Sequence, residues 1–204
     1  MVVVRYLTHP QVRVDPEVEV PLWGLNEVGA ARVAALAERP GALSRTVRIV
    51  SSAERKAQET AGPLARALGL TVEVRPGMHE NDRSATGFLP PAEFEAMADA
   101  FFADPHRSIR GWEPARAAQS RILAEVEACL ALPPSGDVLF VGHGGVGTLL
   151  YCALAGLEID RRHDQGQDRR LGGGGNWFAF DLRDRRPRTG WQPMEALSDA
   201  PSQA

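Results

Sequence analysis

Residues 2–10 read Val-Val-Val-Arg-Tyr-Leu-Thr-His-Pro, and this stretch decides how the rest of the chain is interpreted. Its β-branched and apolar residues predict a buried strand over 2–7, of the kind found in the middle of a parallel sheet. Pro10 has no backbone N–H, so ladder pairing stops just after His9. The sequence therefore places a histidine at the carboxyl end of a buried strand.

Strands and helices then alternate along the chain. Further strands are predicted at 47–50, 70–74, 138–141 and 176–182. Helices are predicted from the Asn26 cap to Leu36, and at 53–68, 114–132 and 146–154. This alternation predicts an α/β fold, an αβα sandwich of three layers with a mostly parallel, doubly wound sheet.

Two segments depart from the alternation. Residues 76–110 are rich in Gly, Pro, Asp and Phe, with one helical piece near 92–102, and we interpret them as a small lid insertion. Residues 183–204 are polar and contain proline, which predicts a partly disordered C-terminal extension. The main domain is accordingly expected to span residues 1–182.

Composition limits the classes of function. A net charge of -3 gives no reason to expect nucleic-acid binding, and no apolar run is long enough to span a membrane. No secretory signal is recognised, so a cytoplasmic location is expected by default. Cys129 and Cys152 lie in apolar helical stretches and are expected to be core thiols, so neither a disulfide nor a metal site is predicted. A homodimer is left open.

Several chemically active side chains follow the predicted strands. His9 and His143 end two of them, Lys56 lies on the helix after a third, and Glu80 and Arg83 follow the next. Each alone has a plainer explanation: a structural histidine, a solvated lysine, a capping glutamate. Ligands of parallel sheets, however, bind beyond the carboxyl ends of the strands, so the five are expected to share one site.

This set of residues suits phosphate chemistry. A neutral imidazole is a good nucleophile near pH 7, and cations or a helix N-terminus stabilise a transferring phosphoryl group. A carboxylic acid can protonate the leaving alcohol. Lys56 is also the only lysine in a chain with 23 Lys and Arg residues, which draws attention to its position.

Four motifs resemble those of the histidine phosphatase superfamily, which includes the cofactor-dependent phosphoglycerate mutases. They are His9 after the first strand with Pro-Leu-Trp-Gly-Leu-Asn-Glu-Val-Gly at 21–29, Ser-Ala-Glu-Arg-Lys-Ala-Gln-Glu-Thr-Ala at 52–61, Glu80, and Val-Gly-His-Gly-Gly at 141–145. The resemblance implies that His9 is the phosphorylated nucleophile and that His143 donates to the phosphate oxygens. It further implies that Glu80 acts as general acid and then as base, without a metal or other cofactor.

The chain departs from the family pattern at two places. The family reads Arg-His-Gly where this chain has Thr8-His9-Pro10, and the helix arginine falls on Lys56. Thr8 offers only a hydroxyl, and lysine binds phosphate as a point charge instead of a bidentate fork. We hypothesise that Arg83 supplies the missing fork, with Gly144 at the start of the following helix also binding phosphate.

The resulting prediction is metal-independent hydrolysis of a small-molecule phosphate monoester through a phosphohistidine. One alternative is a catalytically weak or inactive module that binds a phosphate ligand, which the loss of the arginine favours. A second is phosphoryl transfer of the phosphoglycerate mutase type. A dinucleotide site is a further reading, because Gly142, Gly144 and Gly147 match the spacing of its fingerprint. A dinucleotide site also needs a following strand that ends in an acidic residue, and the sequence after Gly147 shows no convincing one. The dinucleotide site is therefore disfavoured.

Overall fold

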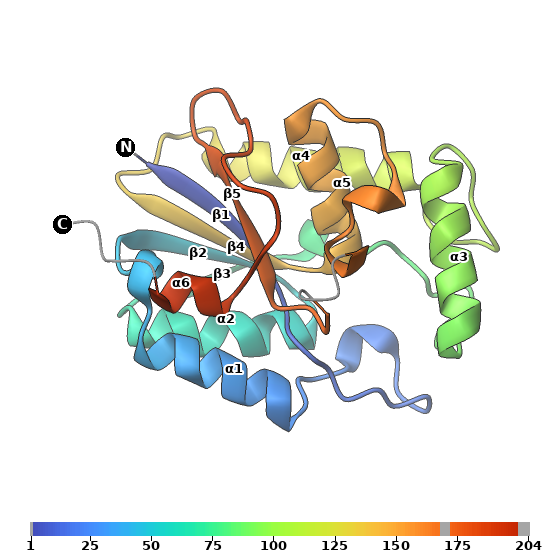
Figure 1. The fold of residues 1–204 in the computed structure, drawn as a ribbon, viewed down its shortest axis with the longest axis horizontal. Coiled ribbons are helices and arrows are strands. Elements are labelled where there is room, and N and C mark those ends of the chain that lie inside the picture. Colours follow the sequence, from blue (N-terminus) through green and yellow to red (C-terminus); the bar gives the residue numbers. More distant parts are fainter. Residues whose placement is uncertain (1, 168–171, 200–204) are drawn as a thin grey trace.

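The computed structural model describes residues 2–167 and 172–199 of the 204-residue chain. Within them, six strands form one sheet in the order β3-β2-β4-β1-β5-β6 (Figure 1). The strands are β1 (Val3–Thr8), β2 (Thr46–Ser52), β3 (Val72–Arg75), β4 (Asp137–Gly142), β5 (Asn176–Asp181) and β6 (Gln192–Pro193). β1 to β4 are mutually parallel, while β5 and β6 pair antiparallel. The predicted α/β fold with a mostly parallel sheet is confirmed.

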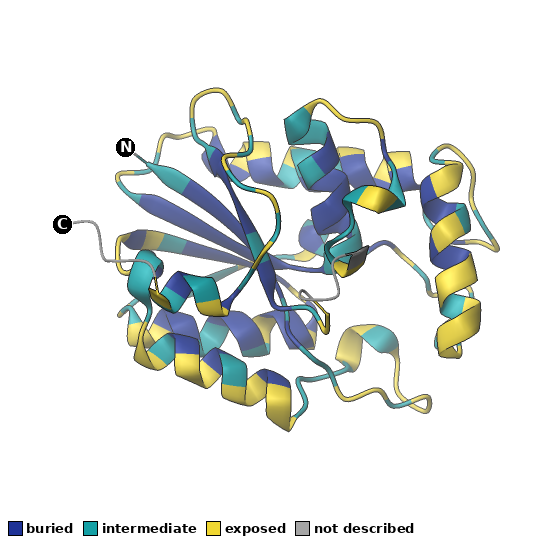
Figure 2. Cartoon of the chain, viewed as in Figure 1, coloured by how far each residue is buried: buried dark blue, intermediate teal, exposed yellow. Residues whose placement is uncertain are grey.

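Helices cover both faces of this sheet. They are α1 (Glu27–Glu38), α2 (Arg55–Ala67), α3 (Pro91–Ala103), α4 (Ala115–Leu130), α5 (Gly144–Ala155) and α6 (Glu195–Asp199). In Figure 1, α1, α2 and α6 lie on one side of the strands and α4 and α5 on the other, with α3 set beyond the carboxyl ends of the strands. Figure 2 shows the helices buried on their inner faces and exposed on their outer faces. Short 3-10 turns connect these elements: η1 (Val20–Leu22), η2 (Gly41–Leu43), η3 (Pro76–Met78), η4 (Arg161–His163) and η5 (Gln165–Gln167).

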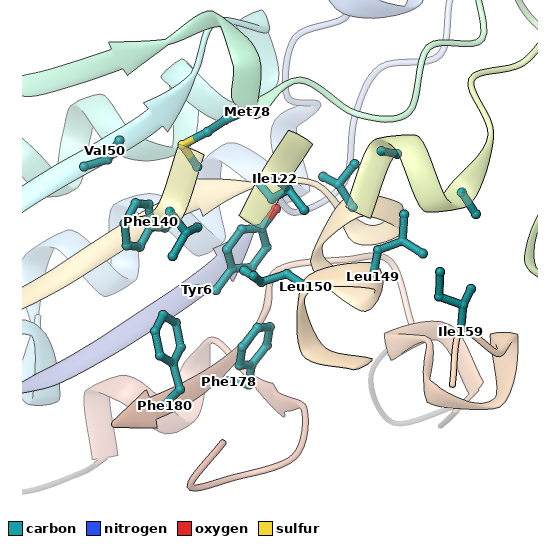
Figure 3. Close-up of a cluster of buried hydrophobic side chains, with 14 of the residues drawn as sticks. Tyr6, Val50, Met78, Ile122, Phe140, Leu149, Leu150, Ile159, Phe178 and Phe180 are labelled. Atoms are coloured by element: carbon teal, nitrogen blue, oxygen red, sulfur yellow. The ribbon is translucent and has the colours of Figure 1, made fainter. Parts of the chain in front are cut away.

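The sheet divides the core into two clusters. Every residue of β4 is buried, and its side chains alternate between the two faces as strand geometry requires. Val138 and Phe140 join the cluster under α4 and α5, whereas Leu139 and Val141 join the cluster over α1 and α2. Figure 3 shows the first of these clusters, where Tyr6 and Phe140 meet aromatic side chains of β5. A strand that is buried on both faces lies in the middle of the sheet. The residue after β4, His143, therefore emerges at the centre of the sheet's carboxyl edge.

The chain beyond residue 182 takes part in the fold. β6 pairs with β5, and α6 packs near η2 and α1. Met194 and Leu197 are fully buried in the cluster over α1 and α2. The ordered structure thus reaches residue 199, further than the sequence analysis places the end of the domain. Residues 200–204, where part of the disorder is expected, lie outside the described residues.

The register of the strands sets where the functional residues emerge. Thr8 lies opposite Gly142, so His9 and His143 are the next residues on neighbouring parallel strands. On the other side of β4, Ser51 lies opposite Val141. Parallel strands in register end at one edge, and this edge faces the loops that carry the other predicted site residues.

Two smaller expectations concern membrane spans and thiols. In the part of the chain that the structure describes, no helix has the length and apolar character needed to cross a membrane. Cys129 and Cys152 are both buried and free, as the apolar helical setting predicts.

The burial of the C-terminal segment gives a stability prediction. Leu197→Ala should lower the free energy of unfolding by about 2–4 kcal/mol, because it empties a fully buried position. The matched control is Leu132→Ala, at a side chain that is 84% exposed, which should change it by less than about 0.5 kcal/mol. Urea denaturation of both variants measures the difference. Equal effects would contradict a structural role for α6.

Candidate active site

His9 and His143 lie side by side at the carboxyl edge of the sheet. Their ring centroids are 5.3 Å apart, and the rings meet edge to face at 68°. The His9 amide donates to the Gly142 carbonyl at 3.0 Å, which continues the β1–β4 ladder to the histidine itself. His9 is half-buried on a cavity wall, whereas His143 is 0% exposed and lies behind it.

The His9 ring is held in a form suited to nucleophilic attack. Its Nδ1 lies 2.9 Å from the Pro10 carbonyl oxygen, which can only accept, so the proton sits on Nδ1. Burial, followed by the proximity of His143, lowers the pKa of His9 to about 3. The imidazole is therefore neutral at pH 7, with the Nε2 lone pair available.

His143 is fixed by contacts to its backbone and its ring. Its amide donates to the Tyr6 hydroxyl at 3.0 Å, and that hydroxyl donates to the His143 carbonyl at 3.2 Å. The ring Nε2 lies 2.8 Å from Ser52 Oγ, and Nδ1 is buried without a hydrogen-bond partner among the described residues. Burial lowers the pKa of His143, so this ring is also neutral at pH 7 unless an anion binds near it.

Lys56 reaches the cavity wall but is paired with a carboxylate that the sequence analysis did not identify. Its ammonium donates to Glu54 Oε2 and, at 2.9 Å, to the Val20 carbonyl, and the side chain is almost fully buried. The other carboxylate oxygen, Glu54 Oε1, accepts from the Glu80 amide at 2.8 Å and lies 3.6 Å from His143 Nε2. The charge of Lys56 is thus balanced before any ligand binds.

Glu54 is itself strongly stabilised as a carboxylate. Burial would raise the pKa of Glu54, but His143 and Lys56 outweigh burial and lower the pKa to about 2. Its position directly before α2 reads in sequence as an ordinary helix start. Only the tertiary contacts to Lys56 and Glu80 reveal that it belongs to the site.

Glu80 caps the helix that follows His143. Its Oε2 accepts from the Gly145 amide at 3.0 Å and its Oε1 from the Val146 amide at 2.8 Å. Burial would raise the pKa of Glu80, but His143, Arg83 and these two amides together lower it. Glu80 is therefore a carboxylate at neutral pH, stabilised by the N-terminus of α5.

Gly144 and Arg83 are left with unused donors. Gly144 is the first residue of α5, and its amide donates to no described residue, so it is free for an anion. The Arg83 guanidinium lies over the rings of Phe94 at 5.1 Å and Trp112 at 5.7 Å. The guanidinium forms no hydrogen bond or ion pair with the described residues, so its N–H donors are available to a ligand.

Thr8 does not join this group. It is fully buried, and its hydroxyl donates to Gln165 Oε1 at 2.9 Å and to the Asn176 carbonyl at 3.2 Å. The same oxygen accepts from the Asn176 amide at 3.0 Å. Thr8 is not part of the cavity wall, so its hydrogen bonds serve the junction of β1 and β5.

A cavity of about 480 Å³ unites the remaining predicted residues. His9, Lys56, Glu80, Arg83 and Gly144 all line it. Its outer wall is aromatic and comes mainly from α3 and the flanking loops: Trp23, Phe94, Phe101, Phe102 and Trp112.

The segment that precedes β5 closes the cavity with polar side chains that the sequence analysis did not single out. These are Arg161, Asp164 and Gln165. Among residues 2–167 and 172–199, no three His, Cys, Asp or Glu side chains cluster in a way that could hold a metal ion.

The Gly172–Gly175 run packs against the end of the strand that precedes His9. The Gly175 amide donates to the His9 carbonyl at 2.9 Å. At Gly174, where φ is +73°, a Cβ would lie 2.5 Å from that carbonyl oxygen. Only glycine fits there, because any side chain would push the turn off the backbone of His9.

The buried Glu54 carboxylate predicts an acid-sensitive stability. Its pKa is lowered from 4.5 to about 2, so its contribution is complete above pH 4.5 and is lost as pH falls towards 2. The wild-type free energy of unfolding should therefore fall more steeply over this range than that of Glu54→Gln, by on the order of 3 kcal/mol. Glu17→Gln, at an exposed carboxylate, should follow the wild type. Parallel acid profiles for Glu54→Gln and the wild type would refute this account.

Comparisons with solved structures find the same fold in known proteins. The structure of mycobacterial glucosyl-3-phosphoglycerate phosphatase with inorganic phosphate matches with a TM-score of 0.70 at 25% identity, covering 94% of this chain and 95% of that one. Bacillus stearothermophilus YhfR matches at 0.74 with 19% identity, covering 93% and 95%. Phosphoserine phosphatase of Entamoeba histolytica, in complex with 3-phosphoglyceric acid, matches at 0.73 with 16% identity, covering 97% and 100%.

These matches extend over almost the whole of each chain, so the fold is shared from end to end. No curated protein matches the sequence closely enough to count as a relative. The model of the histidine phosphatase superfamily, branch 1, matches residues 11–170, which is most of the chain. This protein therefore belongs to branch 1 of the histidine phosphatase superfamily.

Proposed function

We propose that this phosphatase of the histidine type hydrolyses small-molecule phosphate monoesters through a phosphohistidine on His9, without a metal ion. The observation that carries the proposal is the state of the His9 ring. Its Nδ1–H is donated to Pro10, its pKa is lowered to about 3, and its ring stands on the cavity wall against His143. An uncharged, oriented imidazole is what attack on phosphorus requires.

The charge that develops on the phosphoryl oxygens has several partners in this cavity. The Gly144 amide lies at the positive end of α5, and the Arg83 guanidinium has free donors above an aromatic platform. His143, neutral in the free protein, can take up a proton when a phosphate dianion lies next to it. Together they provide the electrostatic stabilisation that phosphoryl transfer needs.

A specific observation favours the second candidate, a phosphate-binding module with little or no turnover. Thr8 is not part of the cavity wall, and the charge of Lys56 is balanced by Glu54. A single transition-state donor is worth about 3–4 kcal/mol, so the loss of bidentate donors would slow catalysis severely. Phosphate binding without His9-dependent turnover would identify this case. A mutase is less well supported, because holding a bisphosphate needs more than one unpaired cation, and Arg83 is the one left unpaired among the described residues of the cavity wall.

The substrate is proposed only as a class. The aromatic outer wall with Phe94 and Trp112 suits an ester whose body offers an apolar or planar face. The related structures are named for glucosyl-3-phosphoglycerate and phosphoserine, which shows how widely the ester body varies among proteins of this fold.

Removal of the nucleophile tests the proposal directly. His9→Ala should lower kcat on a generic aryl phosphate by at least about a thousandfold, because no other group can carry the phosphoryl intermediate. His106→Ala, at an exposed loop histidine, is the control and should keep full activity. Turnover should also persist in excess chelator, and acid-labile phosphate should appear on His9 after rapid quenching. Turnover that needs an added metal ion would reject the mechanism.

Arg83 should provide the fork that Thr8 does not. Arg83→Ala should reduce kcat/KM by about 10²–10³-fold, and Arg83→Lys should recover only part of it, since lysine lacks the planar pair of donors. Arg107→Ala removes an exposed arginine of the same insertion and should have no effect. Steady-state kinetics with one phosphate ester measure kcat/KM of Arg83→Ala, Arg83→Lys and Arg107→Ala against the wild type. Full activity in Arg83→Ala would remove Arg83 from the site.

A further inference from the structure

We propose that Glu54 is a positioning residue of the reaction and acts through His143. Its carboxylate holds one side of the His143 ring and balances the charge that this ring takes up when a phosphate dianion is bound. The inference rests on the proposed function and deepens it. Glu54 is not part of the wall of the cavity that His9 lines, so it has to act on a ligand there through a neighbour.

The two nitrogens of the His143 ring have different surroundings. Nε2 lies 2.8 Å from Ser52 Oγ and 3.6 Å from Glu54 Oε1. The Glu54 amide donates to the same Ser52 Oγ at 3.2 Å, so Glu54 approaches the histidine with both its backbone and its side chain. Nδ1 is buried and has no hydrogen-bond partner among the described residues. It is therefore the nitrogen left for a phosphate oxygen bound beside His9, whose ring centroid lies 5.3 Å from that of His143.

These surroundings decide where the ring protons lie when phosphate is bound. A carboxylate oxygen only accepts hydrogen bonds, so Glu54 Oε1 favours a proton on Nε2, and the Ser52 hydroxyl can accept from it. The oxygens of a phosphate dianion also only accept, so Nδ1 needs a proton to bond one of them. A ring with both protons is an imidazolium. Its second proton comes from solvent, or from a monoanionic ester that binds as the dianion.

Two carboxylates and two cations act on the charge of this ring. Glu54 favours the charged form most and Glu80 adds to this, whereas Lys56 and Arg83 oppose it. In the free protein burial outweighs the carboxylates and lowers the pKa of His143. A bound dianion adds further negative charge at the ring and favours its protonation.

His9 faces the same ring and benefits from its charge. A positive His143 lowers the pKa of His9, which keeps the nucleophile unprotonated while phosphate is bound. A charged His143 and a neutral His9 therefore support each other. His143 adds its charge to the cavity only when the dianion is present.

The pairing of Glu54 with Lys56 leaves one carboxylate oxygen for this task. Lys56 donates to Oε2, while Oε1 accepts from the Glu80 amide at 2.8 Å and faces His143 Nε2. The hydrogen bond from the Glu80 amide fixes the carboxylate, and with it the distance to the ring. Because Lys56 and Glu54 act on the charge of His143 with opposite signs, removing one or the other should have opposite effects on it.

The pH dependence of kcat tests this role, because it reports groups of the enzyme–substrate complex. In Glu54→Gln, the alkaline limb of the kcat profile should move to lower pH by about 1–2 units, since the charged His143 ring loses its partner. In Lys56→Gln, the limb should move to higher pH. The control Glu59→Gln removes a carboxylate that is paired with Arg55 on α2, and should leave the limb in place. Limbs that stay in place, or that move the same way in Glu54→Gln and Lys56→Gln, would overturn the proposal.

Nuclear magnetic resonance of the wild type keeps the test independent of these variants. With ¹⁵N-labelled histidine at neutral pH and saturating inorganic phosphate, both ring nitrogens of His143 should carry protons, and one should lose its proton when phosphate is removed. The His143 signals are identified by their absence from His143→Gln. A His143 ring that stays neutral in the phosphate complex would contradict the proposed role, even if Glu54→Gln does not fold. Absence of His9-dependent turnover would instead reject the proposed function, and the resonance experiment would still give the charge of His143.

Discussion

The parallel pairing of β1 with β4 is the constraint on which the site depends. It places Thr8 opposite Gly142, and therefore sets the two histidine rings 5.3 Å apart. Tyr6 tightens this pairing from within the core, because its hydroxyl bonds both backbone groups of His143. This position of Tyr6 leaves no room for side chains at two neighbouring residues. A Cβ on Gly142 would lie 2.2 Å from the Tyr6 hydroxyl, and a Cβ on Gly147 would lie 2.6 Å from the Tyr6 ring. Two of the three glycines in this motif, Gly142 and Gly147, are thus explained by a buried tyrosine and do not require a dinucleotide.

The outline of the site could be predicted from sequence because it follows from topology. Once residues 2–7 and 138–141 are recognised as buried parallel strands, the residues that follow them must emerge at one edge. Lys56, Glu80 and Arg83 follow strands of the same sheet, and all three do line the cavity with His9. The order and direction of the strands are enough to place these residues at one edge, and hydrophobic patterns indicate both.

What could not be predicted depends on side-chain direction and on contacts distant in sequence. Glu54 precedes a helix and looks like any helix start, yet its two oxygens meet Lys56 and Glu80. Thr8 lies next to His9, but its hydroxyl donates to Gln165, which is 157 residues away in sequence. The C-terminal segment has few apolar residues, so no periodic pattern identifies α6, although Leu197 is fully buried. Pattern reasoning is weakest where a single side chain decides the outcome.

The balance of charge in the cavity connects these details. Lys56 is neutralised by Glu54 and Glu80 by the start of α5. Under the proposed function, we therefore expect Arg83 and the Gly144 amide to provide most of the attraction for phosphate among the described residues. A helix N-terminus attracts anions with about half an elementary charge and does not titrate. We expect such a site to bind a phosphate dianion less strongly than one with two free arginines, and to release inorganic phosphate more readily. If product release limits turnover, weaker binding of the product offsets part of the loss in the chemical step. The departures from the family motif then change the balance between chemistry and release without requiring that activity be lost.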